Sequence, residues 1–179
     1  GKSYVVPGFF AADGNAAETS SDAGNIWKVN FSPDKIGEWT YKVSFRKGDA
    51  ISVDDNPDAG EPVGFNGATG SFTVAESDKS GVDFRAKGRL QYIGERYLQF
   101  AETKEFFLKG GAGSPESFLG YYDFDQTPAS HKYAPHAQDW KTGDPSWQNG
   151  KGKALIGALN YLSSKGMNAA YFLTLNILG

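Results

Sequence analysis

Residues 25–45, NIWKVNFSPDKIGEWTYKVSF, decide how the first half of this chain is interpreted. Apolar and polar residues alternate through 25–31 and again through 38–45, and each segment gathers its aromatic and branched side chains on one side. A period of two with such side chains is typical of half-buried strands. The intervening SPDKIG has the composition of a tight turn. We therefore predict a hairpin here.

Further short strands are predicted at residues 4–10, 50–53 and 71–74, with polar loops rich in Asp, Asn, Gly and Pro between them. Short strands separated by turns at this spacing favour an antiparallel β-sandwich. We expect the sandwich to span residues 3–77, within a first domain of residues 1–78. The side chains expected in its core are Trp27, Phe31, Trp39, Tyr41, Val43 and Phe72.

A change of pattern follows a predicted linker at residues 78–81. Three short strands, at 89–93, 97–101 and 105–108, predict a small meander. The sequence Ser114-Pro115-Glu116 has the order of a helix start, with a serine N-cap, a proline at the first position and an acid in the first turn. Residues 126–150 form a long polar loop with no period, and loops of that length are usually functional or disordered.

The last part of the chain predicts a helix at 152–165 and then an apolar strand at 168–176. The helix is expected to bury Leu155, Leu159 and Leu162. A helix followed by a continuously apolar strand is typical of a parallel α/β sheet. We expect the strand to lie parallel to 105–109, and either its other partners follow Gly179 or the strand docks elsewhere. Residues 79–179 are expected to open a larger α/β domain. An unpaired apolar edge would favour self-association.

Composition excludes several classes of function. The 179 residues carry a net charge of only −3, which implies no attraction to nucleic acid or anionic membrane. Cysteine is absent, so disulfides and cysteine–metal sites are excluded. No stretch approaches the ~20 apolar residues of a membrane span. The chain starts without methionine and almost directly in a strand, which suggests truncation or processing, and no cofactor is expected.

Several segments resemble a known family. VPGFFAADGNA at 6–16, the F-S-P-x-x-x-G-x-W-x-Y hairpin and GSFTV at 70–74 resemble the Ig-like N-terminal domain, of unknown function, that precedes a (β/α)8 barrel in many bacterial glycoside hydrolases. Residues 88–100, 105–127, 135–140 and 152–176 resemble the entry into that barrel. The resemblance covers nearly the whole chain, and the ordered combination is more specific than the hairpin alone.

The resemblance implies a mostly β protein, with an Ig-like sandwich followed by the opening of a truncated barrel. It implies the N-terminal fragment of an extracellular or periplasmic hydrolase that degrades polysaccharides. Glycosidases need two carboxylates, which in most barrel glycosidases sit on later strands, so we expect the fragment itself to be inactive. A non-catalytic carbohydrate-binding or scaffold module is the alternative.

Barrel active sites lie at the carboxyl ends of the strands, and three candidate positions follow from that. Glu116 is either a substrate-contacting acid or a first-turn acid favoured by the helix dipole. His136, Asp139 and Trp140 could line a sugar subsite, or Trp140 could only pin its own loop. Asn176 ends a buried strand, where a polar side chain suggests a role at the rim.

Two other groups are weaker candidates. Asp123 and Asp125 could bind a cation or sugar hydroxyls, although acids flanked by aromatic residues are more often strand-end or turn residues. His131 and His136 are too few for a zinc site, and no H-E-x-x-H motif occurs. No metal site is therefore expected, and the catalytic residues stay unassigned.

Overall fold

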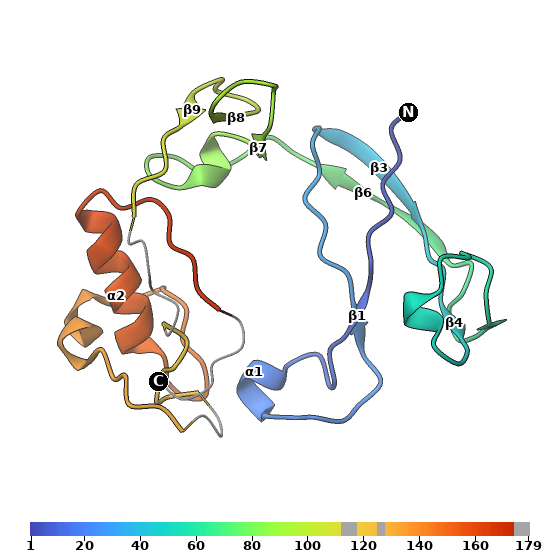
Figure 1. Ribbon diagram of the computed structural model, residues 1–179, viewed down its shortest axis with the longest axis horizontal. Coiled ribbons are helices and arrows are strands. Elements are labelled where there is room, and N and C mark those ends of the chain that lie inside the picture. The colour runs from blue at the N-terminus through green and yellow to red at the C-terminus, as the bar shows by residue number, and fades with distance from the viewer. Residues whose placement is uncertain (112–117, 125–127, 174–179) are drawn as a thin grey trace. The chain divides into compact units, whose positions relative to one another are not determined.

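The computed structural model describes residues 1–111, 118–124 and 128–173. The chain divides into two compact units, one of residues 1–31 with 108–179 and the other of residues 32–107. The described residues form four small antiparallel sheets, three with two strands and one with three, together with short helices (Figure 1). Neither a clear sandwich nor a barrel is present among these residues.

The first unit begins with a short ribbon. β1 (Phe9–Phe10) pairs antiparallel with β2 (Trp27–Lys28), and the rings of Phe10 and Trp27 meet edge to face with centroids 5.7 Å apart. Trp27 is 46% exposed, so its predicted place in a core is wrong. The loop between the strands contains α1 (Ala16–Thr19). The carboxylate of Asp13 accepts bonds from the Thr19 hydroxyl and the Asn15 N–H, which lower its pKa.

The core of this unit lies between a helix and an aromatic cluster. α2 (Lys153–Ser164) confirms the predicted helix and buries Ala154, Leu155, Gly157 and Ala158. Tyr121, 1% exposed, packs against Ala154 and Leu155, and the surrounding partly buried rings are Phe118, Phe124, Tyr133 and Trp147. The prediction of a buried Leu159 is wrong, since it is 40% exposed, and Leu162 is half-buried. Small residues rather than leucines make most of the buried face.

The strand predicted at 168–176 is not formed by residues 168–173, and the remainder lies outside the described residues. Instead the N–H groups of Asn168 and Ala169 donate to the carbonyl of Gly110. The Asn168 side chain accepts from the Gly110 N–H at 2.7 Å and donates to the Leu108 carbonyl at 2.9 Å. The segment therefore adjoins residues 108–110 through one asparagine and not as a parallel strand.

The second unit contains the longest ribbon, and it corrects the predicted hairpin. β3 (Gly37–Lys42) pairs antiparallel with β6 (Thr69–Val74), so that Trp39 faces Phe72 and Tyr41 faces Gly70. β3 therefore pairs with a strand about 30 residues later and not with residues 25–31. The Tyr41 ring lies directly over Gly70, where any added Cβ would overlap it. The neighbouring atoms are the far end of an exposed tyrosine side chain, so the contact accompanies the pairing and does not determine it.

The loop between β3 and β6 also differs from prediction. It contains β4 (Arg46–Lys47), paired antiparallel with β5 (Glu61–Pro62). Residues 51–53, predicted as a strand, form the 3₁₀ helix η1 (Ile51–Val53). The expected core is correspondingly loose: Tyr41 and Phe72 are exposed, and Phe31, Trp39 and Val43 are only half-buried.

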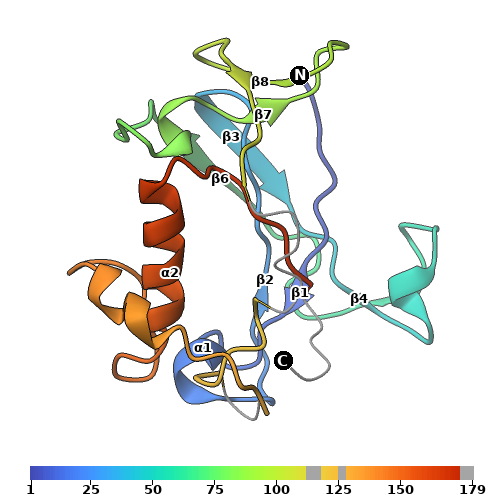
Figure 2. The same ribbon diagram turned by 60° about the vertical axis from the view of Figure 1, so that its left-hand side comes forward.

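The predicted meander is confirmed. β7 (Leu90–Gln91), β8 (Leu98–Phe100) and β9 (Phe106–Phe107) form one antiparallel sheet in sequence order. Phe100 is 3% exposed, with the rings of Phe84 and Phe107 at 5.4 and 5.9 Å (Figure 2 shows the sheet from a second side). The meander therefore has a small core of its own.

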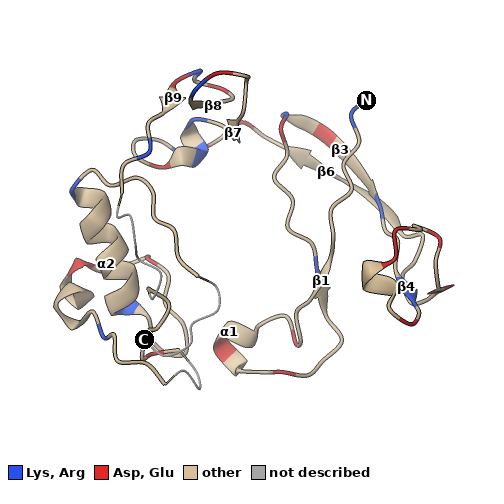
Figure 3. Cartoon of the chain, viewed as in Figure 1, with Lys and Arg blue, Asp and Glu red and all other residues tan. Residues whose placement is uncertain are grey.

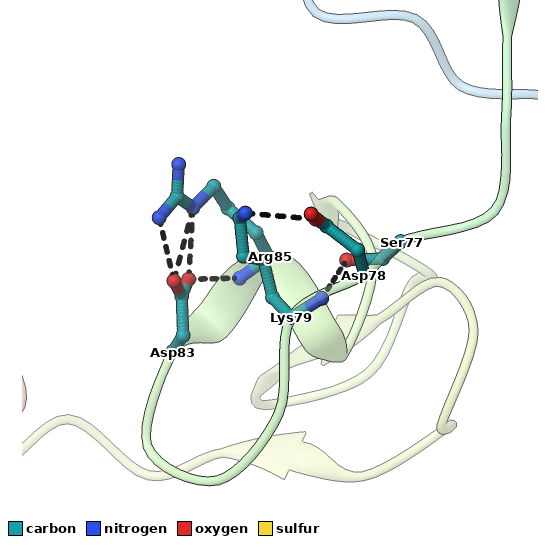
Figure 4. A network of polar contacts seen from close by, with 5 residues as sticks. All are labelled: Ser77, Asp78, Lys79, Asp83 and Arg85. Carbon is teal, nitrogen blue, oxygen red and sulfur yellow. Dashed lines mark hydrogen bonds and ion pairs between the residues drawn. The ribbon is translucent and has the colours of Figure 1, made fainter.

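A polar network fixes the chain before this meander (Figure 4). Asp83 caps η2 (Phe84–Ala86) by accepting from the Arg85 N–H, and the Arg85 guanidinium donates to the same carboxylate at 2.6 Å. These bonds lower the pKa of Asp83 to about 2. Lys79 pairs with Asp78 at 2.8 Å. Both pairs are on the surface, so they order the backbone locally and contribute little to global stability.

Candidate functional site

Three of the five residues predicted to contact a substrate come together at one short helix. η3 (Ala134–Asp139) carries His136 and Asp139, and Trp140 follows as its C-cap. Figure 2 shows this helix, in orange, lying along α2. The two helices meet at Gly157, where an added Cβ would overlap the carbonyl oxygen of His136. The absence of a side chain at residue 157 therefore sets how closely η3 approaches α2.

His136 and Asp139 form a hydrogen-bonded pair. Nδ1 of His136 lies 3.0 Å from Oδ2 of Asp139, and each side chain is 30% exposed. An ionised carboxylate can only accept, so Nδ1 carries the proton. In the neutral ring this leaves Nε2 as an acceptor. The ring also packs against Tyr161 of α2, with centroids 4.8 Å apart, so its orientation is held from two sides.

Trp140 is half-buried and held at both its edge and one face. Its indole N–H donates to the Pro145 carbonyl at 3.0 Å. The ammonium of Lys153, from the first turn of α2, lies 4.3 Å from the ring centroid, within range of a cation–π contact. The alternative that Trp140 pins its own loop therefore has direct support. A ligand that stacks on this ring must use the other face or displace Lys153.

Asn160 belongs to the site although the sequence analysis did not select it. Its amide donates to the carbonyl of Asp139 at 2.9 Å and to Oδ2 of Asp144 at 2.7 Å. The Lys141 N–H donates to the same carboxylate oxygen, and both bonds lower the pKa of Asp144. One side chain of α2 thus anchors η3 and the following turn. A polar residue within the apolar run LIGALNYL was the available signal.

Asp123 has a structural role. Its carboxylate accepts from the N–H of Gly152, the N-cap of α2, at 2.9 Å, and from the Tyr121 hydroxyl at 3.3 Å. Burial, with the nearby Asp123 charge as a further cause, raises the pKa of Tyr121 to about 12. The Trp147 indole donates to the Asp123 carbonyl at 3.3 Å. Asp123 therefore connects the aromatic core to the start of α2.

Of the remaining candidates, the structure describes His131. Glu116, Asn176 and Asp125 lie outside the described residues, as does the helix start predicted at Ser114. The His131 ring stacks on the Tyr133 ring, with centroids 5.9 Å apart. The backbone carbonyl of His131 accepts a hydrogen bond from the Tyr122 N–H. His131 therefore supports the loop that precedes η3.

Acidic residues gather in the loop between β4 and β5 of the second unit, where Figure 3 shows red ribbon. This loop is organised by Arg46, whose guanidinium donates to the carbonyls of Asp58, Ala59 and Gly60, each at 2.7 Å. Among residues 1–111, 118–124 and 128–173, no three acidic or histidine side chains are placed to hold a metal ion. One of these acids, Asp54, accepts a hydrogen bond from the Asn56 N–H at 2.8 Å.

An open groove of about 530 Å³ lies on the β3–β6 ribbon. It is lined by hydroxyl-bearing and charged side chains, including Thr40, Ser71, Glu38 and Lys42. Of the predicted substrate-contacting residues that the structure describes, His136, Asp139 and Trp140, none lines it.

Comparison with known proteins finds one match. Residues 1–46 match a domain of unknown function, DUF5060. The match covers β1, α1, β2 and β3, which is 46 of the 179 residues. No curated protein and no solved structure is significantly similar to the chain. No helix in the described part of the chain is long and apolar enough to cross a membrane.

Proposed function

We propose that this chain is the N-terminal part of a polysaccharide-degrading glycoside hydrolase, located outside the cell or in the periplasm, and that its described residues bind glycan and do not cleave it. The proposal that the chain binds glycan is supported by one observation. His136 and Asp139 form a hydrogen-bonded pair on η3, and Trp140 directly follows them, so the three side chains of the predicted sugar subsite lie at one helix. The resemblance of the N-terminal strands to a domain that precedes such hydrolases supports the wider assignment.

The cluster offers the groups that recognise sugars. The exposed part of the Trp140 indole is a flat apolar surface on which the C–H face of a pyranose ring can stack. His136 Nε2 is free of the Asp139 bond and accepts from a sugar hydroxyl, while the second Asp139 oxygen accepts from another. The Nδ1 bond and the Tyr161 contact hold the imidazole in place, which reduces the entropy lost on binding.

Hydrolysis requires more than this cluster. Glycosidases use two carboxylates about 5–10 Å apart, one of them a proton donor. The Asp123 carboxylate is hydrogen-bonded to the Gly152 N–H at the N-terminus of α2. The Asp144 carboxylate is hydrogen-bonded to the Asn160 amide and the Lys141 N–H. Proton transfer alone contributes roughly 10²–10⁴-fold to the rate, so a chain without the carboxylate pair is expected to show no turnover.

The test is affinity electrophoresis of the whole chain through gels containing marine or plant polysaccharides, with a reducing-end assay in parallel. Retardation by at least one polysaccharide is expected, with Trp140→Ala abolishing it and no reducing ends appearing. Trp27→Ala is the matched control, because it removes an exposed indole from β2. Retardation unchanged in Trp140→Ala would overturn the assignment of the site. Hydrolysis lost in Glu116→Gln would overturn the view that the chain is catalytically empty.

One observation favours the alternative of a non-catalytic module. The open groove on β3 and β6 is lined by threonine and serine hydroxyls beside Glu38 and Lys42, and such a polar strand face can bind glycan without catalysis. Under this alternative, Thr40→Val would reduce retardation and Trp140→Ala would not. The same gels therefore separate the two proposals.

A further inference from the structure

The N-terminal segment contacts a turn that lies about 130 residues later in the same unit. The carboxylate of Glu18, in α1, accepts from the backbone N–H of Gln148 at 2.7 Å. The Ser20 hydroxyl, one residue after α1, accepts from the side-chain amide of Gln148 at 2.7 Å. A single residue of the turn is thus bound through both its backbone and its side chain.

That turn has an unfavourable backbone. Gln148 and Asn149 have φ angles of 42° and 62°, in the left-handed region that residues with a side chain rarely occupy. Such conformations persist where surrounding contacts hold them. Here the turn is closed by the Trp147 and Lys151 backbones, which bond to each other at 3.1 and 2.8 Å. Lys151 also donates to the Gln148 side chain at 2.7 Å.

The residues that flank the turn belong to the core and to the candidate site. Trp147 stacks on Phe124, with centroids 5.2 Å apart and planes 8° from parallel. Gly152, directly after the turn, is the N-cap of α2 and is held by Asp123. The next residue, Lys153, covers one face of Trp140. The 147–151 turn is joined directly to the start of α2, so a change in its backbone conformation also displaces Gly152 and Lys153.

We propose that α1 is an internal clip: Glu18 and Ser20 dock on the Trp147–Lys151 turn and hold it in its left-handed conformation. The partner of this surface is a segment of the same chain. Residues 1–31, the larger part of the DUF5060 match at 1–46, then belong structurally to the unit that carries the candidate site and are not an accessory module separate from it, whereas residues 32–46 of the match lie in the other unit. This inference does not depend on glycan binding.

Hydrogen exchange on the full chain tests the clip, because the Gln148 amide itself makes the contact. Glu18→Ala should speed exchange of that amide by about tenfold, as expected for loss of a bond to a charged group. Asp22→Ala, which removes a carboxylate from the loop after α1, is the matched control and should leave the rate unchanged. The Phe100 amide, bonded to the Glu105 carbonyl in the other unit, reports whether the rest of the chain stays folded.

A second variant separates docking from local packing. In the Gln148→Gly variant, glycine adopts the left-handed conformation without support from α1. Adding Glu18→Ala to this variant should therefore speed exchange of the Lys151 amide much less than Glu18→Ala does in the wild-type chain. Three outcomes would overturn the proposal. They are a Gln148 exchange rate within twofold of wild type in Glu18→Ala, an equal acceleration in Asp22→Ala, and an effect of Glu18→Ala on Lys151 that is undiminished by Gln148→Gly.

Discussion

At the scale of single residues, Gly157 decides whether the candidate site forms. It lies mid-helix, where glycine is normally unfavourable by roughly 0.5–1 kcal/mol relative to alanine. Its lack of a Cβ lets the carbonyl of His136 lie against α2. The helix therefore gives up intrinsic stability at this position in order to accommodate η3.

Gly157→Ala is expected to lower the free energy of unfolding by about 1–3 kcal/mol, because overpacking against the His136 carbonyl outweighs the gain in helix propensity. Urea denaturation followed by circular dichroism measures the change. Gly110→Ala is the control, since among the described residues its Cβ would meet only the Asn168 side chain, at 3.9 Å. A more stable Gly157→Ala protein would contradict the close packing of η3 on α2.

Tyr121 makes the stability of its unit depend on alkaline pH. Burial raises its pKa from 10.0 to about 12 in the folded chain, so between these values the unfolded chain loses a proton that the folded chain retains. The free energy of unfolding should therefore be intact below pH 10 and fall as the pH rises toward 12. Chemical denaturation from pH 9 to 12 should show a shallower decline in Tyr121→Phe. Identical declines in the two proteins would refute this role.

At the scale of elements, the alternation in residues 25–45 correctly predicted strand character but not pairing. Period two says which side chains share a face, and it carries no information about the partner strand. A local hairpin is the simplest choice, yet β3 pairs with β6, where Gly70 admits the Tyr41 ring. The SPDKIG segment has turn composition, but the strands on its two sides, β2 and β3, belong to different sheets.

The pairing of β3 with β6 can be tested through Trp39 and Phe72, which lie directly opposite each other. A double-mutant cycle with alanine at both positions should give a coupling energy of roughly 0.2–1 kcal/mol, the usual value for a cross-strand pair. A cycle between Trp39 and Val53, which lies in η1 and is 79% exposed, should be additive. No coupling between Trp39 and Phe72 would mean that the strands pair in another register.

Elements with strong local signals were predicted best. α2 has its apolar periodicity within its own residues, and the meander has short strands joined by short turns. Leu159 shows the limit of this reasoning, because the helix period does not reveal that Gly157 and Ala158 face the closest neighbour. The strand expected after α2 is not formed by the described residues 168–173. The backbone N–H and carbonyl of Gly110 are instead hydrogen-bonded to the side chain and backbone of Asn168.

The same division applies to the candidate site. His136, Asp139 and Trp140 are three and four residues apart, so a single turn of helix brings them together and the sequence alone could group them. Lys153 and Asn160 are supplied by α2, through contacts between residues 13 to 21 positions apart. No local pattern predicts which face of one helix meets another.

At the scale of the whole molecule, we propose that the chain self-associates. Fully buried apolar side chains are few among the described residues, whereas large ones such as Val5, Val82 and Tyr92 are 75–99% exposed. Exposed apolar surface of this kind favours association. Light scattering should show a mass that increases with concentration, and added salt should not reverse it. A constant monomer mass at millimolar concentration would contradict the proposal.

The first unit is built from residues 1–31 and 108–179, with residues 32–107 between them in the sequence. During synthesis α1 must therefore wait for its turn at Gln148 while well over a hundred residues emerge. At ~5–20 residues per second, the intervening segment of roughly 75 residues alone takes about 4–15 s. The strands of residues 32–107 can pair with one another during that time. Residues 1–31 consequently stay without the rest of their unit until residues 108 onward have been synthesised, whereas the strands of residues 32–107 already have their partners.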